Sequence, residues 1–448
     1  MPPKTITSAK DYLIESAVIT ADRSEGSEID ITAIIIQLNI FENIERAYLT
    51  GSVTVKDDLD LINQIDITGT ERLELVISIP TNPVSLTINF IIEGIESAIK
   101  YGDQPEMVTF KLIQQVAFDS STRKFSKAYS GKPEEIIASI LKDNLNLDLI
   151  NLSIPSAQAE MKVIIPYMTP LQACDWILSR MTTEYGAPYF LYSAINEKSL
   201  VLKDLQTILI ENAWNYSGGK GLPFSYNQAQ AQYTDNSDIR QQSFVIENVK
   251  YTNTENTSKL VKMGAMGANY SWSDVTSGIT ESRHFSLKEA LGQIESIVLK
   301  GNKKLTIDAE YIMNNVKIDQ LNSSYVHQVL SRNTYLDYNN YFEENDITKY
   351  MLTATARAMK ILLFKSNIQI TVPGIQFIFG ENRSIGTNIN LLIYNSNVTL
   401  QGYPGVDAEI LKDKKRSGDY LVHSTLHMFT LGKHSAVIYG VKLTDQKA

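Results

Sequence analysis

The sequence predicts a mainly β protein with α+β inserts, and three observations support this fold class. Apolar and polar residues alternate with period two through much of residues 1–120. Stretches of helical spacing follow in residues 121–205, and strand-like alternation returns in residues 346–448. A chain of 448 residues is also too long for one compact core, and its length suggests about three domains.

Residues 1–120 are predicted to form antiparallel strands. Turn signals divide this stretch at residues 81–83 (Thr-Asn-Pro) and 101–103 (Tyr-Gly-Asp). Before, between and after these turns, apolar residues recur at every second position, as in the sets Leu73, Leu75, Ile77 and Ile79; Leu86, Ile88, Phe90 and Ile92; and Val108, Phe110, Leu112, Val116 and Phe118. This pattern is typical of a half-buried sheet, and closure into a barrel removes the unpaired edges of such a sheet. We therefore expect a first barrel in residues 1–120, completed by part of residues 205–242.

One predicted strand, from Ile29 to Ile40, departs from the alternation because it is apolar at both parities. Its apolar side chains include Ile34, Ile36 and Leu38. A strand that is covered on both faces has this pattern. The second cover can come from another element of the same chain or from a neighbouring subunit, and the residues leave both open. Ile34, Ile36 and Leu38 are therefore candidates for a subunit interface.

Residues 121–205 are predicted to form an inserted α/β domain. Pro133 suits a first helical turn, and an apolar stripe of helical spacing follows it: Ile136, Ile137, Ile140, Leu141 and Leu145. A second helix is marked by Thr169 as N-cap, Pro170 at the first helical position and Gln172 in a capping box. Its apolar face is formed by Leu171, Cys174, Ile177, Leu178 and Met181. Two short strands are expected after it: 188–194 and 198–202.

The second half of the chain is predicted to repeat the layout of strands, helical insert and strands. Residues 212–240 are polar and loop-like, and a second β-rich region with a helical insert is expected over residues 243–345. The expected helices cover residues 287–315 and 345–361. Residues 346–448 are expected to complete a second barrel with the following strands: 368–372, 375–379, 389–394, 421–431 and 436–443.

The charge balance and the apolar runs exclude two broad classes of protein. Asp and Glu number 50 against 41 Lys and Arg, which gives a net charge of −9. Surfaces that grip nucleic acid are strongly basic, so this balance argues against that class. The apolar runs are far shorter than the roughly 20 residues that cross a bilayer, and the N-terminus lacks the apolar core of a signal peptide. We expect the chain to be synthesised in the cytoplasm and not to insert into a membrane.

The sequence contains none of the familiar catalytic motifs. Cys174 is the single cysteine and is expected to be a buried thiol. His423 and His427 fall on a predicted strand, where four residues span about 13 Å, too far to share a metal ion. Acidic clusters in residues 57–60 and 343–346 fit solvated turns better than cation sites or a glycosidase acid pair. We therefore predict no enzyme activity, no cofactor and no metal.

Tyrosine is abundant, with 23 tyrosines against 14 phenylalanines. Tyr335, Tyr338 and Tyr341 cluster in an otherwise polar segment. Tyrosine is enriched at protein interfaces because its ring is apolar and its hydroxyl is polar. The cluster therefore indicates a contact surface, although the same residues can also border the core of the second domain.

Three stretches of the sequence carry a resemblance to a known family. The first consists of residues 48–55 (Tyr-Leu-Thr-Gly-Ser-Val-Thr-Val) and 69–73. The second consists of residues 165–171, 175–177 and 186–192, and the third of residues 370–374, 416–422 and 426–427. In this order they resemble the trimeric baseplate hub proteins of contractile-tailed phages (T-even hub-like and late control protein-like), which are related in fold to the base of the type VI secretion spike.

The resemblance implies two tandem tube-type antiparallel β-barrels in each subunit, so that a homotrimer presents a pseudo-sixfold ring. Such a ring adapts a sixfold tail tube to a threefold central spike and leaves a channel for DNA in transit. The implied partners are the tail spike protein, the tail tube or tube-initiator protein and the baseplate wedge proteins, all in the tail baseplate of a virion. The resemblance implies no catalytic residues.

Two other functions remain open. A tail-associated cell-wall hydrolase would need acidic residues, for which Asp57, Asp58, Glu343 and Glu344 are the candidates. A peripheral glycan-binding β module would be a monomer or part of a fibre rather than a ring. The oligomeric state of the chain therefore discriminates the hub from the glycan-binding module.

Overall fold

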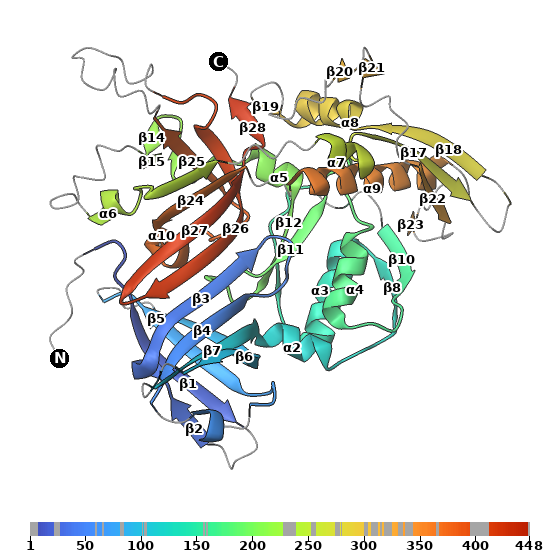
Figure 1. The fold of residues 1–448 in the computed structure, drawn as a ribbon. Coiled ribbons are helices and arrows are strands. Elements are labelled where there is room, and N and C mark those ends of the chain that lie inside the picture. The colour runs from blue at the N-terminus through green and yellow to red at the C-terminus, as the bar shows by residue number, and fades with distance from the viewer. Residues whose placement is uncertain are drawn as a thin grey trace, which may run out of the picture.

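Figure 1 shows the fold of the chain in the computed structural model. The structure describes residues 8–21, 27–58, 61–64, 67–80, 85–100, 102, 105–155, 157, 160–226, 239–251, 257–273, 278, 280–299, 303–305, 312–313, 316–317, 325–329, 335–336, 344–363, 367–394 and 412–446.

The N-terminal residues form strands, as their alternation predicts. Side chains that the alternation assigns to the core are buried, among them Leu73, Leu75, Ile77, Phe90 and Phe110. The elements are β1 (Leu13–Ala21), β2 (Ser27–Asp30), the 3-10 turn η1 (Thr32–Ile34), β3 (Ile35–Asn43), β4 (Thr50–Asp57), α1 (Leu61–Gln64), β5 (Arg72–Ser78), β6 (Ser85–Ile99) and β7 (Glu106–Gln114).

Both helices predicted in the insert are present. Pro133 is the first residue of one, and Thr169 and Gln172 form the complete capping box of the other. The predicted continuation of a strand through Val116 and Phe118 is wrong, because a helix begins at Gln115. The elements are α2 (Gln115–Ser121), β8 (Ala128–Gly131), α3 (Pro133–Leu145), β9 (Leu149–Asn151), β10 (Glu160–Ile164), α4 (Pro170–Leu178), β11 (Tyr189–Tyr192), β12 (Leu200–Asp204) and α5 (Leu205–Ile210).

Short elements follow the insert. The stretch predicted as a loop contains a tight hairpin, whose turn at Gly218 and Gly219 has positive φ angles of 57° and 79°. The helix expected over 287–315 is shorter, because strands begin at Lys303. The elements are β13 (Tyr216–Ser217), β14 (Lys220–Gly221), β15 (Phe224–Tyr226), α6 (Ile239–Gln242), β16 (Asn248–Tyr251), α7 (Thr257–Lys262), β17 (Gly267–Ser273), β18 (Thr280–Ser286), α8 (Leu287–Gln293), the π-helical turn η3 (Ile294–Val298), β19 (Lys303–Leu305), β20 (Ile312–Met313), β21 (Val316–Lys317), β22 (Tyr325–Val329) and β23 (Tyr335–Leu336).

The C-terminal part contains the predicted long helix and all but one of the predicted strands. The strand expected over 375–379 is wrong, because that stretch is a short helix that follows Pro373 and Gly374 at the end of a strand. The elements are α9 (Glu344–Leu363), β24 (Ile368–Pro373), α10 (Ile375–Ile378), β25 (Asn388–Ile393), β26 (Gly418–Thr430), β27 (Lys433–Val441) and β28 (Thr444–Gln446).

One 13-stranded sheet joins the two ends of the chain, as Figure 1 shows where β3 runs beside β26. Its strand order is β16-β24-β27-β26-β3-β4-β7-β6-β5-β1-β2, and β25 links β15 to β26. Among the described strands this sheet does not close into a barrel, so mainly β architecture is confirmed and two separate closed barrels are not seen. The part of residues 205–242 that was expected to complete the first barrel supplies β15, which pairs with β25 of the C-terminal part.

The strand predicted from Ile29 to Ile40 is two strands, and this correction explains its double apolar pattern. β2 ends at Asp30, η1 follows, and β3 begins at Ile35. A β-bulge then shifts the register between Ile35 and Gln37, so that Ile35 lies opposite the buried Val55. The bulge inserts one extra residue into β3. As a result, Ile35 before the bulge and Leu38 after it face the same side of the sheet, although one has an odd number and the other an even number.

Candidate assembly interface

The joint between β3 and β26 is the feature that unites the two ends of the chain. The antiparallel register runs from Gln37 opposite Thr430 to Asn43 opposite Ser424 without interruption. β4 and β7 continue the ladder on one side, and β27 and β24 continue it on the other. A regular backbone ladder of this length makes the two halves of the chain one stiff wall.

Two rows on one face of this wall are polar and uncharged across the joint, and the next row on that face is apolar, with Phe41 opposite Leu426. In one row Gln37 has Thr430 and Thr54 as neighbours, and in the next row Asn39 has Met428 and Ser52. We call these residues, together with Thr109, the amide–hydroxyl face. All are half-buried in the chain.

Side-chain hydrogen bonds order the amide–hydroxyl face. The Gln37 side-chain amide donates to Asn39 Oδ1 at 3.1 Å, and Asn39 donates to Ser52 Oγ at 3.3 Å. Thr54 and Thr109 share a hydroxyl–hydroxyl hydrogen bond of 3.0 Å. Neutral polar side chains that hydrogen-bond to one another keep a surface hydrated, and they offer no charged group to a ligand.

The opposite face of the same strands is the hydrophobic core of the N-terminal half. Leu38 and Ile40 of β3 are fully buried there with Val53 of β4 and Phe110 of β7. Phe429 of β26 belongs to the same cluster. The C-terminal hairpin therefore contributes to the core of the N-terminal strands as well as to their hydrogen-bond ladder.

Beside this core, a fully buried polar network fastens the joint. His427 Nε2 lies 2.8 Å from Glu42 Oε2, and His427 Nδ1 lies 3.2 Å from His434 Nε2. The other oxygen of Glu42 accepts hydrogen bonds from Ser384 Oγ at 2.6 Å and from the backbone N–H of Ile195 at 2.5 Å. We call Glu42, His427, His434 and Ser384 the junction network, because it ties β3, β26, β27, the 379–387 loop and the insert together.

The environment of the junction network disfavours a charge on His434. Burial, reinforced by the neighbouring His427, lowers the pKa of His434 well below its ordinary value. The ring of His434 stacks on Phe429 with 4.2 Å between ring centroids, and Gly374 also packs closely against the His434 ring. A Cβ at Gly374 would come within 2.0 Å of this ring, so the close packing requires glycine.

His423, on β26, makes the joint sensitive to acid. Burial lowers its pKa to about 4, below the ordinary 6.5. Its neutral form stabilises the fold above pH 6.5, and that contribution is lost as pH falls, because only the unfolded chain takes up the proton. We expect the wild type to lose about 2.5 kcal/mol more than His423→Asn in urea unfolding between pH 7.5 and pH 4.5.

The control for this pH experiment is His284→Asn, since His284 is exposed on β18. That variant should keep the pH dependence of the wild type. Equal acid losses in the wild type and in His423→Asn would contradict the assignment.

The structure separates the predicted interface residues. Leu38 has no exposed surface in the isolated chain, so its place in the chain's own core removes it from the candidate interface. Ile34 is half-buried and packs against that core, whereas Ile36 is half-buried at the bulge and belongs to neither core cluster. Tyr335 lies in β23, which pairs with β10. Tyr338 and Tyr341 lie outside the described residues.

The residues considered for chemistry are not assembled into a site where the structure describes them, and Glu343 and the side chain of Glu344 lie outside the described part. Cys174 is fully buried, as predicted, and burial raises its pKa. Asp57 binds the backbone N–H of Leu61 with both carboxylate oxygens, at 2.8 and 2.9 Å, which fits a structural turn. In the described ranges no three His, Cys, Asp or Glu side chains gather so as to hold a metal ion. Within the same ranges, no helix combines the length and apolar character needed to cross a membrane.

The junction network could not be found from sequence patterns, because its members are distant in the chain. Glu42 is 385 residues from His427 and 342 from Ser384. One local signal exists: Glu42 shares its parity with Leu38 and Ile40, so that alternation places a carboxylate on the buried face. A charge in such a position requires a buried partner.

No family model matches the chain, and no curated protein matches it. Solved structures do. A tail protein from Neisseria meningitidis has a TM-score of 0.48 and 11% identity, with 97% of each chain covered. The 43 kDa tail protein of prophage MuSo2 from Shewanella oneidensis has a TM-score of 0.48 and 12% identity, with 96% of this chain and 98% of that chain covered.

A type VI secretion protein is also similar. The E. coli c3393 protein, described as a type VI secretion component with structural similarity to the T4 tail proteins gp27 and gp5, has a TM-score of 0.39 and 8% identity. The match covers 98% of this chain and 77% of that chain. These three neighbours are two tail proteins, one of them from a prophage, and a type VI secretion component, in keeping with the groups that the resemblance in the sequence names. With TM-scores below 0.5, they leave the function to be argued from the chain's own residues.

Proposed function

We propose that this chain is a structural baseplate hub, which trimerises and adapts a sixfold tail tube to a threefold central spike. The observation that carries the proposal is the continuous β3–β26 joint, which builds one wall from both ends of the chain. Two halves of similar strand content in each of three subunits give six units around a ring, which is the symmetry match that a tube and a spike require.

The amide–hydroxyl face suits the lining of a channel through which DNA passes. Tight binding of DNA requires Lys and Arg against the phosphates, and this face is built from amides, hydroxyls and a thioether. Lys111, at its border on β7, is paired with Glu93 at 2.7 Å. Three copies would together carry three times the net charge of −9. DNA in transit would therefore meet a wet surface without a strong electrostatic trap.

The ends of the sheet are suited to contacts between subunits. β16 and β2 are the end strands of the described order, and each pairs with one described strand. An end strand of a sheet is where a strand of another chain can add. Ile36, on β3, offers apolar area for a contact with a neighbouring subunit. Tyr335, Tyr338 and Tyr341 are proposed contact residues for a neighbouring subunit or for the tail spike, tail tube, tube-initiator or wedge proteins. A hub built in this way needs no catalytic residue.

The lining role is tested with single cysteines on a chain whose one native cysteine, Cys174, is buried. Ser52→Cys, on the amide–hydroxyl face, should react with a small maleimide but at least about 10-fold more slowly with a polyethylene-glycol maleimide once the trimer forms. The control is Ser139→Cys on α3, which is exposed and should react with both reagents. Equal reaction of Ser52→Cys with both reagents in the assembled state would place this face outside the ring.

A further inference from the structure

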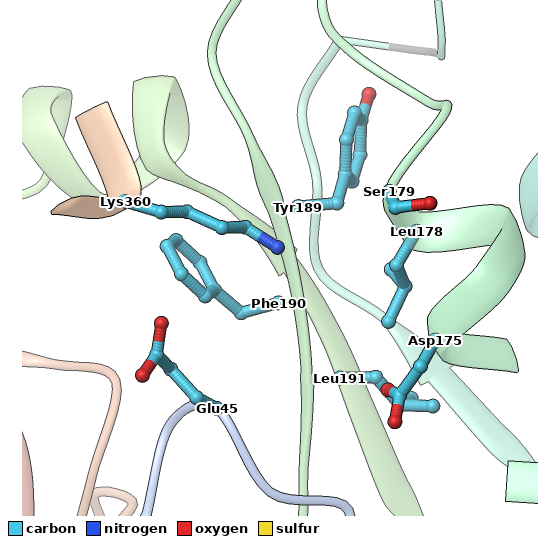
Figure 2. A pocket seen from close by; sticks show the side chains of 8 residues that line it. All are labelled: Glu45, Asp175, Leu178, Ser179, Tyr189, Phe190, Leu191 and Lys360. Carbon is cyan, nitrogen blue, oxygen red and sulfur yellow. The ribbon is translucent and has the colours of Figure 1, made fainter. Parts of the chain in front are cut away.

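A cleft lies where three parts of the chain meet. Its volume is about 290 Å³, at the small end of the range of ligand sites. Glu45 comes from the loop between β3 and β4, Asp175 and Ser179 from α4 and its C-terminal end, Phe190 from β11 and Lys360 from α9. Figure 2 shows the charged ends of Glu45 and Lys360 on either side of the Phe190 ring, with Asp175 across the cleft.

The charges in the cleft face one another without pairing. Lys360 Nζ lies 5.2 Å from the centre of the Phe190 ring, and among the described side chains no carboxylate oxygen lies within 4 Å of it. Phe190 and Leu191 form a buried, apolar floor, whereas Asp175 and Ser179 are exposed at the mouth. A lysine held over an aromatic floor, with two carboxylates in view, presents separate sites for an anion and for cations.

Each of the three charges is under-compensated in this environment. Burial raises the pKa of Glu45 to about 7, against the opposing effects of Lys360 and Arg46. Asp175 has an exposed edge at the mouth, but its carboxyl is partly buried, which raises its pKa, and burial lowers the pKa of Lys360. Ionisable groups with shifted pKa values often gather at functional sites, where a bound ligand can supply charges of the opposite sign.

We propose that this cleft binds a basic amino acid with a free carboxylate. The carboxylate pairs with Lys360, and the cationic groups pair with Asp175 and Glu45. The charges correspond, since the cleft offers two negative groups and one positive group and the ligand offers the reverse. This site is separate from the joint between β3 and β26, and its occupation does not depend on ring assembly. The ligand is a free amino acid, because a C-terminal residue of a chain lacks the α-ammonium group that supplies the second positive charge.

The test is calorimetric titration of the full chain at pH 8 with L-arginine as probe. We expect a dissociation constant below about 1 mM, weakened at least about 10-fold by Lys360→Met and by Asp175→Asn. Matched controls are Lys162→Met and Asp148→Asn, both exposed and outside the cleft, which should bind as the wild type does. Arginine amide, which lacks the carboxylate, should bind at least about 10-fold more weakly than L-arginine.

Two further measurements test the identity of the ligand and the role of the Glu45 charge. L-arginine should bind more tightly than glycyl-glycyl-arginine, whose arginine lacks the α-ammonium group, and the reverse order would contradict the proposal. Glu45→Gln should weaken binding, yet raise the stability of the unliganded protein at pH 8 and not at pH 4.5. The sign follows because the pKa of Glu45 is higher in the fold than in the unfolded chain, so that its ionised form destabilises the fold only at higher pH.

Two other results would overturn the proposal. The first is the absence of binding heat with L-arginine and with glycyl-glycyl-arginine up to about 10 mM. That result would mean that the cleft holds only water. The second is binding that survives unchanged in the folded Lys360→Met and Asp175→Asn variants. Circular dichroism and the thermal midpoint of each variant show whether it is folded.

Discussion

Replacing Glu42 with alanine is expected to lower the free energy of unfolding by about 3–5 kcal/mol. The carboxylate is fully buried and is the acceptor for Ser384 Oγ and the Ile195 N–H, and it faces His427 at 2.8 Å. Its loss leaves three polar groups in the core without an acceptor, and each such group costs about 1–3 kcal/mol. Urea unfolding at pH 7.5 measures the effect.

The control for Glu42→Ala is Glu93→Ala, which removes a surface carboxylate paired with Lys111 at 2.7 Å. Exposed pairs contribute about 0–1 kcal/mol, so this variant should unfold nearly as the wild type does. A double-mutant cycle with His427→Ala should give a coupling energy above about 1 kcal/mol. A loss below about 1 kcal/mol for Glu42→Ala would show that the junction network does not fasten the two ends of the chain.

Leu38→Lys and Ile36→Lys, two residues apart on β3, are expected to differ sharply. Leu38 is fully buried between the N-terminal strands, so a lysine there should cost at least about 4 kcal/mol and prevent folding of the N-terminal half. Ile36 is half-buried at the bulge, so its lysine variant should stay within about 1 kcal/mol of the wild type. Circular dichroism and urea unfolding compare the two.

Ile36→Lys also tests the interface proposal, because a folded variant can be examined for assembly. We expect it to remain folded and to sediment as a monomer at concentrations where the wild type assembles. Gln37→Lys, at the adjacent position on the amide–hydroxyl face, is the matched control for added charge and should still assemble. A variant at Ile36 that is folded and fully assembled would assign the apolar cover of this residue to the single chain.

Local patterns predicted the elements well where one face of an element is buried. The alternation at Leu73, Leu75 and Ile77 and the capping box at Thr169 and Gln172 both correspond to observed structure. The alternation rule failed at Val116 and Phe118. These residues continue the period of two from the strand before them, but they lie in a helix that is too short to show a helical period. The stretch after Gly374 failed for the same reason.

The joint and the cleft could not be predicted, since both depend on residues far apart in the chain. The pairing of β3 with β26 depends on register between strands almost 400 residues apart, which no local pattern specifies. The 3-10 turn that divides β2 from β3 was also hidden, because it lies within the apolar run, and the bulge in β3 continues that run at both parities. In the cleft, Glu45, Asp175 and Lys360 stand in unrelated local patterns, and only the tertiary fold brings their charges together.

The most direct test of the central claim is the mass of the purified full chain in solution, by sedimentation equilibrium at micromolar concentration. The hub account predicts a species of three times the 50.2 kDa of one chain. It also predicts that Ile36→Lys shifts this species to the monomer without loss of β structure. A strict monomer, alone and after addition of a tail spike protein, would contradict the account.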